Sequence, residues 1–202
     1  MKSNKSLKDS LLSEFSVRLE AFGFTPRLRH QEWRRRSHHG AHILHANIAN
    51  YEGGLGVLVS ACIKIEAVEK LVKPGAADTS TIGTFLENLA GLPPLHHEIA
   101  SIPDVRLVSD KVVGLLTDFG EPFLAKYSEP SIVLELLLSD ERLAVQCCPS
   151  DVYRSMNVCA LLKLEGRDIE ASDYVVRRLP EMRKNERPRL LEFASSLGLS
   201  IH

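Results

Sequence analysis

The sequence predicts an α+β protein with an N-terminal helix, an antiparallel β-meander and a helical C-terminal half. Apolar residues recur at helical spacing over residues 6–22, alternate strictly over 55–65, and return to helical spacing after residue 103. Because strands and helices are segregated along the chain rather than alternating, the pattern argues against a doubly wound parallel sheet. The chain has 202 residues, of which 44% are hydrophobic, so it can bury a sizeable core.

The N-terminal part begins with a helix and continues with strands. The apolar positions of the predicted helix 6–22 are Leu7, Leu11, Leu12, Phe15 and Leu19. Gly23 follows as the expected C-terminal stop. Strands are predicted over residues 25–29, 32–36, 41–50 and 55–65, with a turn at 51–54. Every odd-numbered residue of the last strand is apolar, so this face is expected to pack against helices.

The rest of the chain is predicted to be mostly helical. Residues 81–89 are expected to form a short helix and residues 96–102 one more strand. Helices are then predicted over 103–119, 131–138, 151–165, 167–183 and 188–197. Pro180 is expected to kink the helix that contains it. We expect an α+β meander region over residues 1–103 and a helical region over 104–202, packed together as one domain.

The cysteines and the N-terminus indicate a cytoplasmic protein. Cys62, Cys147, Cys148 and Cys159 form no C-x-x-C pair and lie in apolar stretches, which predicts buried thiols. The basic N-terminus runs directly into the amphipathic helix and lacks the apolar core of a signal peptide. No apolar run reaches the roughly 18 residues that span a bilayer, so no membrane partner is expected.

Charge is distributed unevenly along a chain whose total is −1. Residues 1–50 carry a net charge of +5, residues 51–150 carry −7, and residues 151–202 carry +1. The acidic excess predicts a partner-binding face that attracts a basic protein by long-range electrostatics. The candidate residues of this face are Asp110, Asp118, Glu121, Glu129 and Glu135. Solvated helix surfaces are the alternative explanation of these charges.

A basic segment near the N-terminus suggests a second kind of partner. The segment contains Arg27, Arg29, Trp33, Arg34, Arg35 and Arg36. Arginine beside an aromatic side chain can bind phosphates and stack on bases. Arginines that alternate along a strand also solvate one face of a sheet, and their stems cover apolar surface. Nucleic-acid binding by this segment is therefore an alternative function.

A group of histidines raises the question of a metal site. Five histidines lie within sixteen residues: His30, His38, His39, His42 and His45. On a strand, His39 and His45 share a face and His42 points to the other. Zinc needs three or four convergent ligands, and no H-E-x-x-H motif accompanies these histidines. We expect a polar strand face here, with a metal-dependent enzyme that uses the segment His38–His45 as an alternative.

No motif of nucleophilic catalysis or phosphate binding occurs in the sequence. There is no G-x-S-x-G motif and no cysteine in a reactive context. A strand, not a helix, is predicted after Gly53 and Gly54, so these glycines indicate a hairpin turn rather than a phosphate loop. We expect a protein that is not an enzyme and needs no cofactor.

The order of the predicted elements resembles an uncharacterised bacterial α+β family, DUF4304. The resemblance depends on the residues Phe22-Gly23-Phe24, on Trp33-Arg34-Arg35 in a charged strand, and on Thr81-Ile82-Gly83. It covers about the first 120 residues, and the helical tail only loosely. The resemblance implies an α+β fold and a protein that is either a companion of a bacterial toxin or an orphan cytoplasmic domain. It implies no catalytic residues.

These observations predict a non-catalytic cytoplasmic module that binds another protein. An immunity-type inhibitor of a toxin or effector fits, because it needs a rigid scaffold and a charged face complementary to its target. The oligomeric state does not follow from the sequence.

Overall fold

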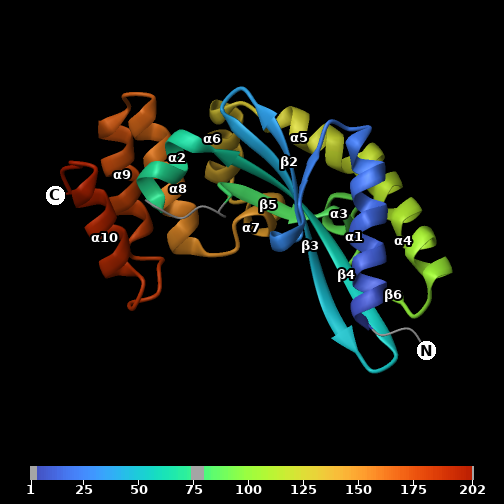
Figure 1. The fold of residues 1–202 in the computed structure, drawn as a ribbon. Coiled ribbons are helices and arrows are strands. Elements are labelled where there is room, and N and C mark those ends of the chain that lie inside the picture. The colour runs from blue at the N-terminus through green and yellow to red at the C-terminus, as the bar shows by residue number, and fades with distance from the viewer. Residues whose placement is uncertain (1–3, 74–79, 202) are drawn as a thin grey trace. The chain divides into compact units, whose positions relative to one another are not determined.

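The structure is a computed structural model that describes residues 4–73 and 80–201. It confirms the predicted α+β class, with an N-terminal helix, an antiparallel sheet in meander order and a helical C-terminal half (Figure 1). The chain forms two compact units. The sheet unit comprises Met1–Ile63 and Gly83–Lys126, and the helical unit comprises Lys64–Ile82 and Tyr127–His202. Helix α4 (Ile102–Leu115) belongs to the sheet unit, whereas the sequence had suggested a boundary at residue 103.

The sheet unit contains the strands and the helices nearest to them in sequence. Its elements are α1 (Asn4–Glu20), β1 (Thr25–Arg27), η1 (Leu28–His30), β2 (Glu32–Ser37), β3 (Gly40–Tyr51), β4 (Gly54–Ile65), β5 (Ile82–Phe85), α3 (Leu86–Leu89), β6 (His97–Ile99), α4, η2 (Leu116–Gly120) and α5 (Glu121–Lys126). The end of β4 and the first residue of β5 pass into the helical unit.

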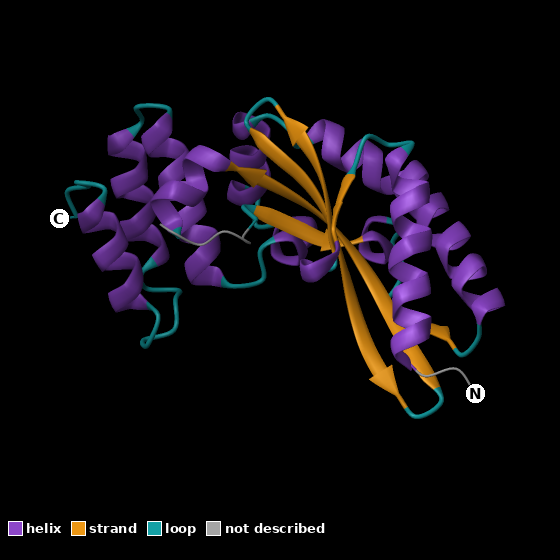
Figure 2. Ribbon diagram, viewed as in Figure 1, coloured by secondary structure: helices purple, strands orange, loops and turns teal. Residues whose placement is uncertain are grey.

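The sheet is a meander with one addition (Figure 2). Its strand order is β1-β2-β3-β4-β5, and β6 also pairs with β4. Strands β2 and β3 are antiparallel, with Trp33 opposite Leu44 and Arg35 opposite His42. Because opposed residues share a face, Trp33, Leu44, Arg35 and His42 all lie on one side of the sheet. Trp33 contacts Phe15, so this is the side that α1 covers.

The odd-numbered residues of β4 form the centre of this core, as predicted. Val57, Val59, Ala61 and Ile63 are each at most 1% exposed. Helix α1 buries the stripe that the sequence predicted: Leu7, Leu11, Leu12, Phe15 and Leu19. Helices α1 and α4 pack against each other, and an ion pair between Arg18 Nη1 and Asp110 Oδ1, at 2.5 Å, links them. The side chains that the strand pattern marks as inward are therefore those that the helices cover.

The prediction of a helix over residues 81–89 was wrong in its first half. Residues Ile82–Phe85 form strand β5, and only Leu86–Leu89 are helical. Ile82 and Thr84 are buried on alternate positions, and both are β-branched, which favours a strand. Gly83 permits the close approach to β4, because a Cβ at this position would lie 2.4 Å from Cys62 Sγ.

The helical path of α4 continues through η2 into α5, beyond the end of the helix predicted over 103–119. Leu116–Gly120 forms a π-helical turn, η2, that connects α4 to α5. A Cβ on Gly120 would lie 2.7 Å from a methyl group of Leu116 and 2.9 Å from one of Leu86, so glycine allows the turn to pack closely. A π turn inserts one residue and rotates the following helix face. Glu121 is the first residue after this turn, and its side chain points inward, so that its carboxylate accepts a hydrogen bond from Arg35.

The helical unit is built from six helices among its described residues. They are α2 (Glu66–Val72), α6 (Pro130–Leu138), α7 (Arg142–Cys147), α8 (Asp151–Leu164), α9 (Asp168–Arg178) and α10 (Arg187–Ser196). Helix α8 is the centre of the unit and packs against α2, α6, α9 and α10. Pro180 does not kink α9 as expected, because the helix ends at Arg178, before the proline.

The cysteines are free thiols, and Cys147, Cys148 and Cys159 are buried, as predicted, while Cys62 is half-buried. Burial raises the pKa of Cys148 to about 11 and that of Cys159 to about 12, so both thiols stay protonated at neutral pH. In the part of the chain that the structure describes, no helix has the length and apolar character needed to cross a membrane.

Replacement of Val59 by Asp is expected to lower the free energy of unfolding by more than about 3 kcal/mol, because it buries a charge without a partner. Urea denaturation followed by circular dichroism measures this loss. Val17→Asp is the matched control, since Val17 is 69% exposed on α1. An unchanged denaturation midpoint for Val59→Asp would show that the face of β4 is assigned wrongly.

Candidate functional site

The aromatic member of the basic segment belongs to the core and is not a binding surface. Trp33 has no exposed area, its ring meets the Phe15 ring edge-on, and its Nε1 donates a hydrogen bond to Ser16 Oγ at 3.0 Å. A side chain held in this way cannot stack on a base. The physical reason is the register of β2, which turns Trp33 toward α1.

The arginines beside Trp33 are engaged inside the sheet unit. The Arg35 guanidinium donates from Nη1 to Phe22 O and to Glu121 Oε2, both at 2.9 Å, and lies over the Phe24 ring at 4.6 Å. Arg34 Nη2 forms an ion pair with Glu32 Oε2 at 2.9 Å. Arg27, Arg29 and Arg36 remain exposed. Of the predicted anion-binding segment, the inner residues therefore organise the fold, and only the exposed arginines face solvent.

The histidines do not converge on one point. His42 is buried and its Nδ1 lies 3.0 Å from Arg35 Nη2, while His45 lies opposite Glu32 in the strand register. The His38 and His39 rings contact each other edge-on at 4.6 Å. Among residues 4–73 and 80–201, no group of three or more His, Cys, Asp or Glu side chains could hold a metal ion.

The sheet unit also contains a buried histidine–carboxylate pair that was not predicted from the sequence. His97 Nε2 of β6 lies 2.7 Å from Glu87 Oε1 of α3, and both side chains are buried. Nothing in the local sequence pattern indicates that these residues meet, because pairing of β6 with β4 brings them together. The pair links α3 to β6 within the sheet unit.

The five acidic residues of the predicted partner-binding face are divided between the two units. Asp110, Asp118 and Glu121 belong to the sheet unit, and Glu129 and Glu135 belong to the helical unit. Asp110 and Glu121 are already paired, with Arg18 and Arg35 respectively. Their charges are largely compensated within the fold, which weakens their attraction for a partner.

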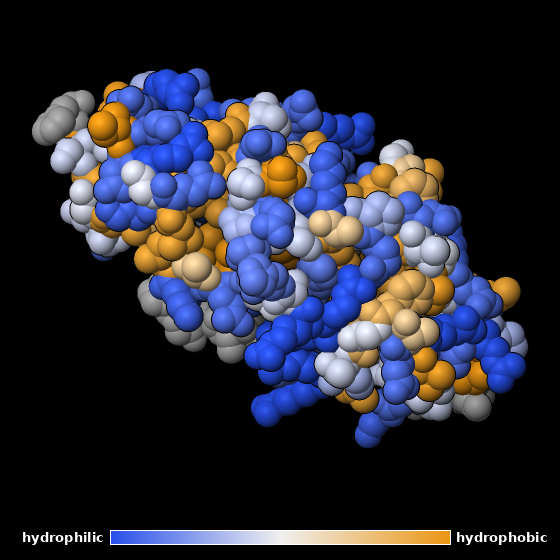
Figure 3. Space-filling model, turned by 90° about the horizontal axis from the view of Figure 1, so that it is seen from above, coloured by the Kyte–Doolittle hydropathy of each residue, from blue (hydrophilic) through white to orange (hydrophobic). Residues whose placement is uncertain are grey.

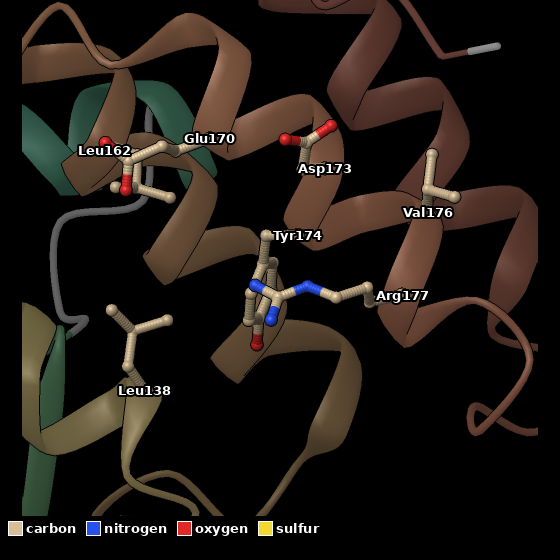
Figure 4. A pocket seen from close by; sticks show the side chains of 7 residues that line it. All are labelled: Leu138, Leu162, Glu170, Asp173, Tyr174, Val176 and Arg177. Carbon is tan, nitrogen blue, oxygen red and sulfur yellow. The ribbon is translucent and has the colours of Figure 1, made fainter.

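The helical unit carries a groove that the sequence analysis did not identify. Its volume is about 460 Å³ (Figure 4). Leu138 of α6, Leu162 of α8 and five residues of α9 line it: Glu170, Asp173, Tyr174, Val176 and Arg177. Leu138, Leu162 and Tyr174 form an apolar floor, and the Arg177 side chain extends from α9 toward Tyr174 (Figure 4). Val176 stands apart from the floor on α9 (Figure 4).

A ring of four charged residues holds the walls of the groove together. Arg178 Nη1 lies 3.0 Å from Asp140 Oδ2, and Arg178 Nη2 lies 3.7 Å from Asp151 Oδ1. Arg154 is nearly fully buried, and it pairs with Asp151 and, at 3.5 Å, with Asp140. We call Asp140, Asp151, Arg154 and Arg178 the charge ring. Because Asp140 follows Leu138 closely and Arg178 follows Arg177, the charge ring positions two opposite walls of the groove.

The charged side chains at the groove differ in whether they have hydrogen-bond or ion-pair partners within the protein. Arg167 donates to Glu170 from Nε at 2.9 Å and from Nη2 at 2.7 Å, and these hydrogen bonds lower the pKa of Glu170. Burial raises the pKa of Tyr174 on the floor. Asp173 and Arg177 have no hydrogen-bond or ion-pair partner among the described residues. A carboxylate and a guanidinium are therefore left for a ligand, one helical turn apart.

The surface around the groove exposes aliphatic side chains. Ile169 is 80% exposed, Val176 42% and Leu138 38%. In the space-filling view, apolar residues form separate patches among polar ones (Figure 3). Ile169 and Val176 lie two turns apart on the outer face of a helix whose other outward residues are charged. The spacing of Ile169 and Val176 was the signal in the sequence for an exposed apolar face on this helix. The signal is hard to recognise, because the same helix also has a buried apolar stripe.

Comparison with known proteins gives no further guide. No protein-family model, curated protein or solved structure matches the chain. The resemblance to DUF4304 therefore stays a prediction.

The surroundings of His42 predict a pH-dependent stability. Burial, together with the Arg35 charge, lowers the pKa of His42 to about 4, from 6.5 in the unfolded chain. Between these two values the unfolded chain binds a proton that the folded chain does not. Stability should therefore fall as the pH decreases from 6.5 to 4, by up to about 1.4 kcal/mol per pH unit.

Replacement of His42 by Asn should remove this pH-dependent loss of stability, because an amide does not titrate. The fold should tolerate the change, since the amide oxygen can still accept a hydrogen bond from Arg35. The measurement is the unfolding free energy at several pH values, with the exposed His38→Asn as the control variant. Equal slopes for wild type and His42→Asn between pH 4 and 6.5 would contradict the assignment.

Proposed function

We propose that the chain is a non-catalytic module that binds another protein through the groove of the helical unit. One observation carries the proposal: an apolar groove flanked by a carboxylate, Asp173, and a guanidinium, Arg177, that have no partner in the described chain. Such a surface gains free energy from a ligand in two ways, by burial of its apolar floor and by pairing of its charges.

The surroundings of the groove favour a protein as the ligand. Two residues that line the groove, Leu138 and Val176, are partly exposed, and Ile169 on the same helix α9 lies outside the lining and is 80% exposed. Exposed apolar surface of this kind is typical of protein contacts. Tyrosine and arginine, here Tyr174 and Arg177, are the residue types that dominate binding energy in protein interfaces. A small molecule confined to the groove would leave the outer aliphatic residues in water.

The charges predict the chemistry of the partner. The Glu170 carboxylate is paired with Arg167, so its charge is largely compensated within the fold. Asp173 attracts a lysine or arginine of the partner, whereas Arg177 selects an acidic residue one turn away. We therefore expect a partner segment with an apolar side chain flanked by a basic and an acidic residue.

An immunity-type inhibitor is the form of this function that we favour. Such an inhibitor needs a preorganised face, since ordering a flexible surface reduces affinity. The charge ring supplies this rigidity beneath α9, with Arg154 held by two carboxylates and by Cys148 O at 3.0 Å. Binding of this kind needs no cofactor.

The test begins with affinity capture from the native cell, followed by binding measurements with the purified partner. Val176→Asp and Asp173→Lys should each weaken binding at least about tenfold, because they place a charge on the apolar wall or reverse the charge that attracts the basic residue. Two variants on α10 are matched controls: Leu191→Asp, at a residue 40% exposed, and Glu192→Lys. The controls should bind within about twofold of wild type.

Three outcomes would overturn the proposal. Wild-type affinity of both groove variants would place the binding surface elsewhere. Capture of nucleic acid that is lost at high salt, and lost when Arg27, Arg29 and Arg36 are changed to Gln, would favour the nucleic-acid alternative. Zinc retained in stoichiometric amount without a metal column, and lost in His39→Ala/His45→Ala, would favour the metal-dependent alternative.

A further inference from the structure

Strand β3 is paired on both sides over only part of its length. Strand β2 pairs with β3 from Gly40 to His45, and Ala46 N donates one more hydrogen bond to Gln31 O at 2.9 Å. Beyond Ala46, β3 continues to Tyr51, where the hairpin to β4 begins. No described strand pairs with the outer edge of residues 47–51, and this edge is bare in the ribbon view (Figure 2).

The direction of the backbone groups on this edge follows from the hydrogen bond of Ala46. In an antiparallel ladder, the N–H and C=O of successive residues point alternately to the two neighbouring strands. Because Ala46 bonds toward β2, the even-numbered residues Ile48 and Asn50 direct their N–H and C=O groups to the bare edge. The odd-numbered residues between them direct theirs to β4.

The bare edge lacks the features by which proteins protect sheet edges. Natural edges are short, contain proline, or carry charged residues, lysine above all. Strand β1, which ends the sheet on the same side, has these features, since it has three residues and includes Pro26 and Arg27. Residues 46–51 contain neither a charge nor a proline. This part of the edge is therefore unprotected.

The structure also holds this edge in an extended form before any partner arrives. Asn4 Nδ2 of α1 donates to Tyr51 O at 3.1 Å, and the Tyr51 ring packs edge-on against His96 at 6.1 Å. Gly56 of β4 lies under the Tyr51 ring, where a Cβ would approach a ring carbon to 2.5 Å. A strand fixed on one side costs little ordering entropy when its free side is paired.

We propose that the bare edge of β3 pairs with the same edge of a second copy of this chain, antiparallel and about a two-fold axis. The edge is self-complementary, because each copy offers donors and acceptors at the same spacing, and the absence of charge avoids like-charge opposition. In the favoured register Ile48 faces Asn50 of the other copy. Only in this register do the outward N–H and C=O groups of both residues meet outward groups of the other copy. Two sheets then join into one.

This interface is separate from the groove of the proposed function, which lies in the other unit. Failure of one proposal therefore leaves the other unaffected. The interface is small, so we expect a weak dimer that forms at high protein concentration.

The test uses the full chain between about 10 μM and about 1 mM, the range in which small interfaces associate. Sedimentation velocity should show a monomer that converts to a dimer as concentration rises. Amide hydrogen exchange, followed by NMR, should slow with concentration at Ile48 and Asn50. The amides of Asn47 and Ala49 should show no such change, because their partner is β4.

Asn50→Pro should weaken dimerisation at least about tenfold, because it removes an outward N–H that has no partner within the chain. Asn50→Val is the matched control, since it keeps the N–H. A protein that remains monomeric at the highest concentration would overturn the proposal. So would a dimer whose formation leaves exchange at Ile48 and Asn50 unchanged. Protection of these two amides only on addition of a different protein would show that a foreign strand occupies the edge. Exchange in the wild-type chain decides the question even if Asn50→Pro fails to fold.

Discussion

The alternation of β4 is the constraint on which the sheet unit depends. Its odd-numbered residues are all buried, so a slip of one residue in the pairing would expose the whole apolar set. The same parity extends across the sheet. It turns Trp33 and Leu44 toward α1, leaves Glu32 and Arg34 on the other face, and directs the backbone of Ile48 and Asn50 to the bare edge of β3. A single periodicity of two thus determines the core and the surface available for strand pairing.

Charge that is partly or wholly buried organises both units, in each case around an arginine with several partners. Removing one partner from a buried ion leaves a large desolvation cost, so such groups occur where the fold supplies several acceptors. Arg35 has a carboxylate, a carbonyl, an imidazole and an aromatic ring around it. Arg154 has two aspartates and a backbone carbonyl. In the basic segment, Arg34 and Arg35 are held by partners within the fold, and the other arginines are exposed. Asp173 and Arg177, which lie in an unremarkable helix, have no partner among the described residues.

The two proposed surfaces use different physics and would serve different ends. The groove combines apolar burial with a pair of opposite charges, and it selects a partner by side-chain chemistry. The bare edge of β3 offers backbone groups alone and selects by shape and by freedom from charge. The first is suited to recognition of one specific protein, and the second to weak self-association.

The sequence alone determined the class of the fold and most of its elements. Helix α1, strands β2 to β4 and the C-terminal helices follow from local periodicity, because each must present one apolar face. Residues 82–85 escaped prediction, since a strand this short is set by the strand beside it, here through the contact of Gly83 with Cys62. The candidate site could not be predicted from the sequence for a related reason. Leu138, Leu162 and Val176 are far apart in the chain, and whether an arginine such as Arg35 or Arg177 faces a partner or solvent depends on which distant carboxylate the fold brings to it. The periodicity of apolar residues depends on neighbours in the sequence and can be recognised there. The pairing of charges and the shape of a groove depend on residues that only the tertiary structure brings together.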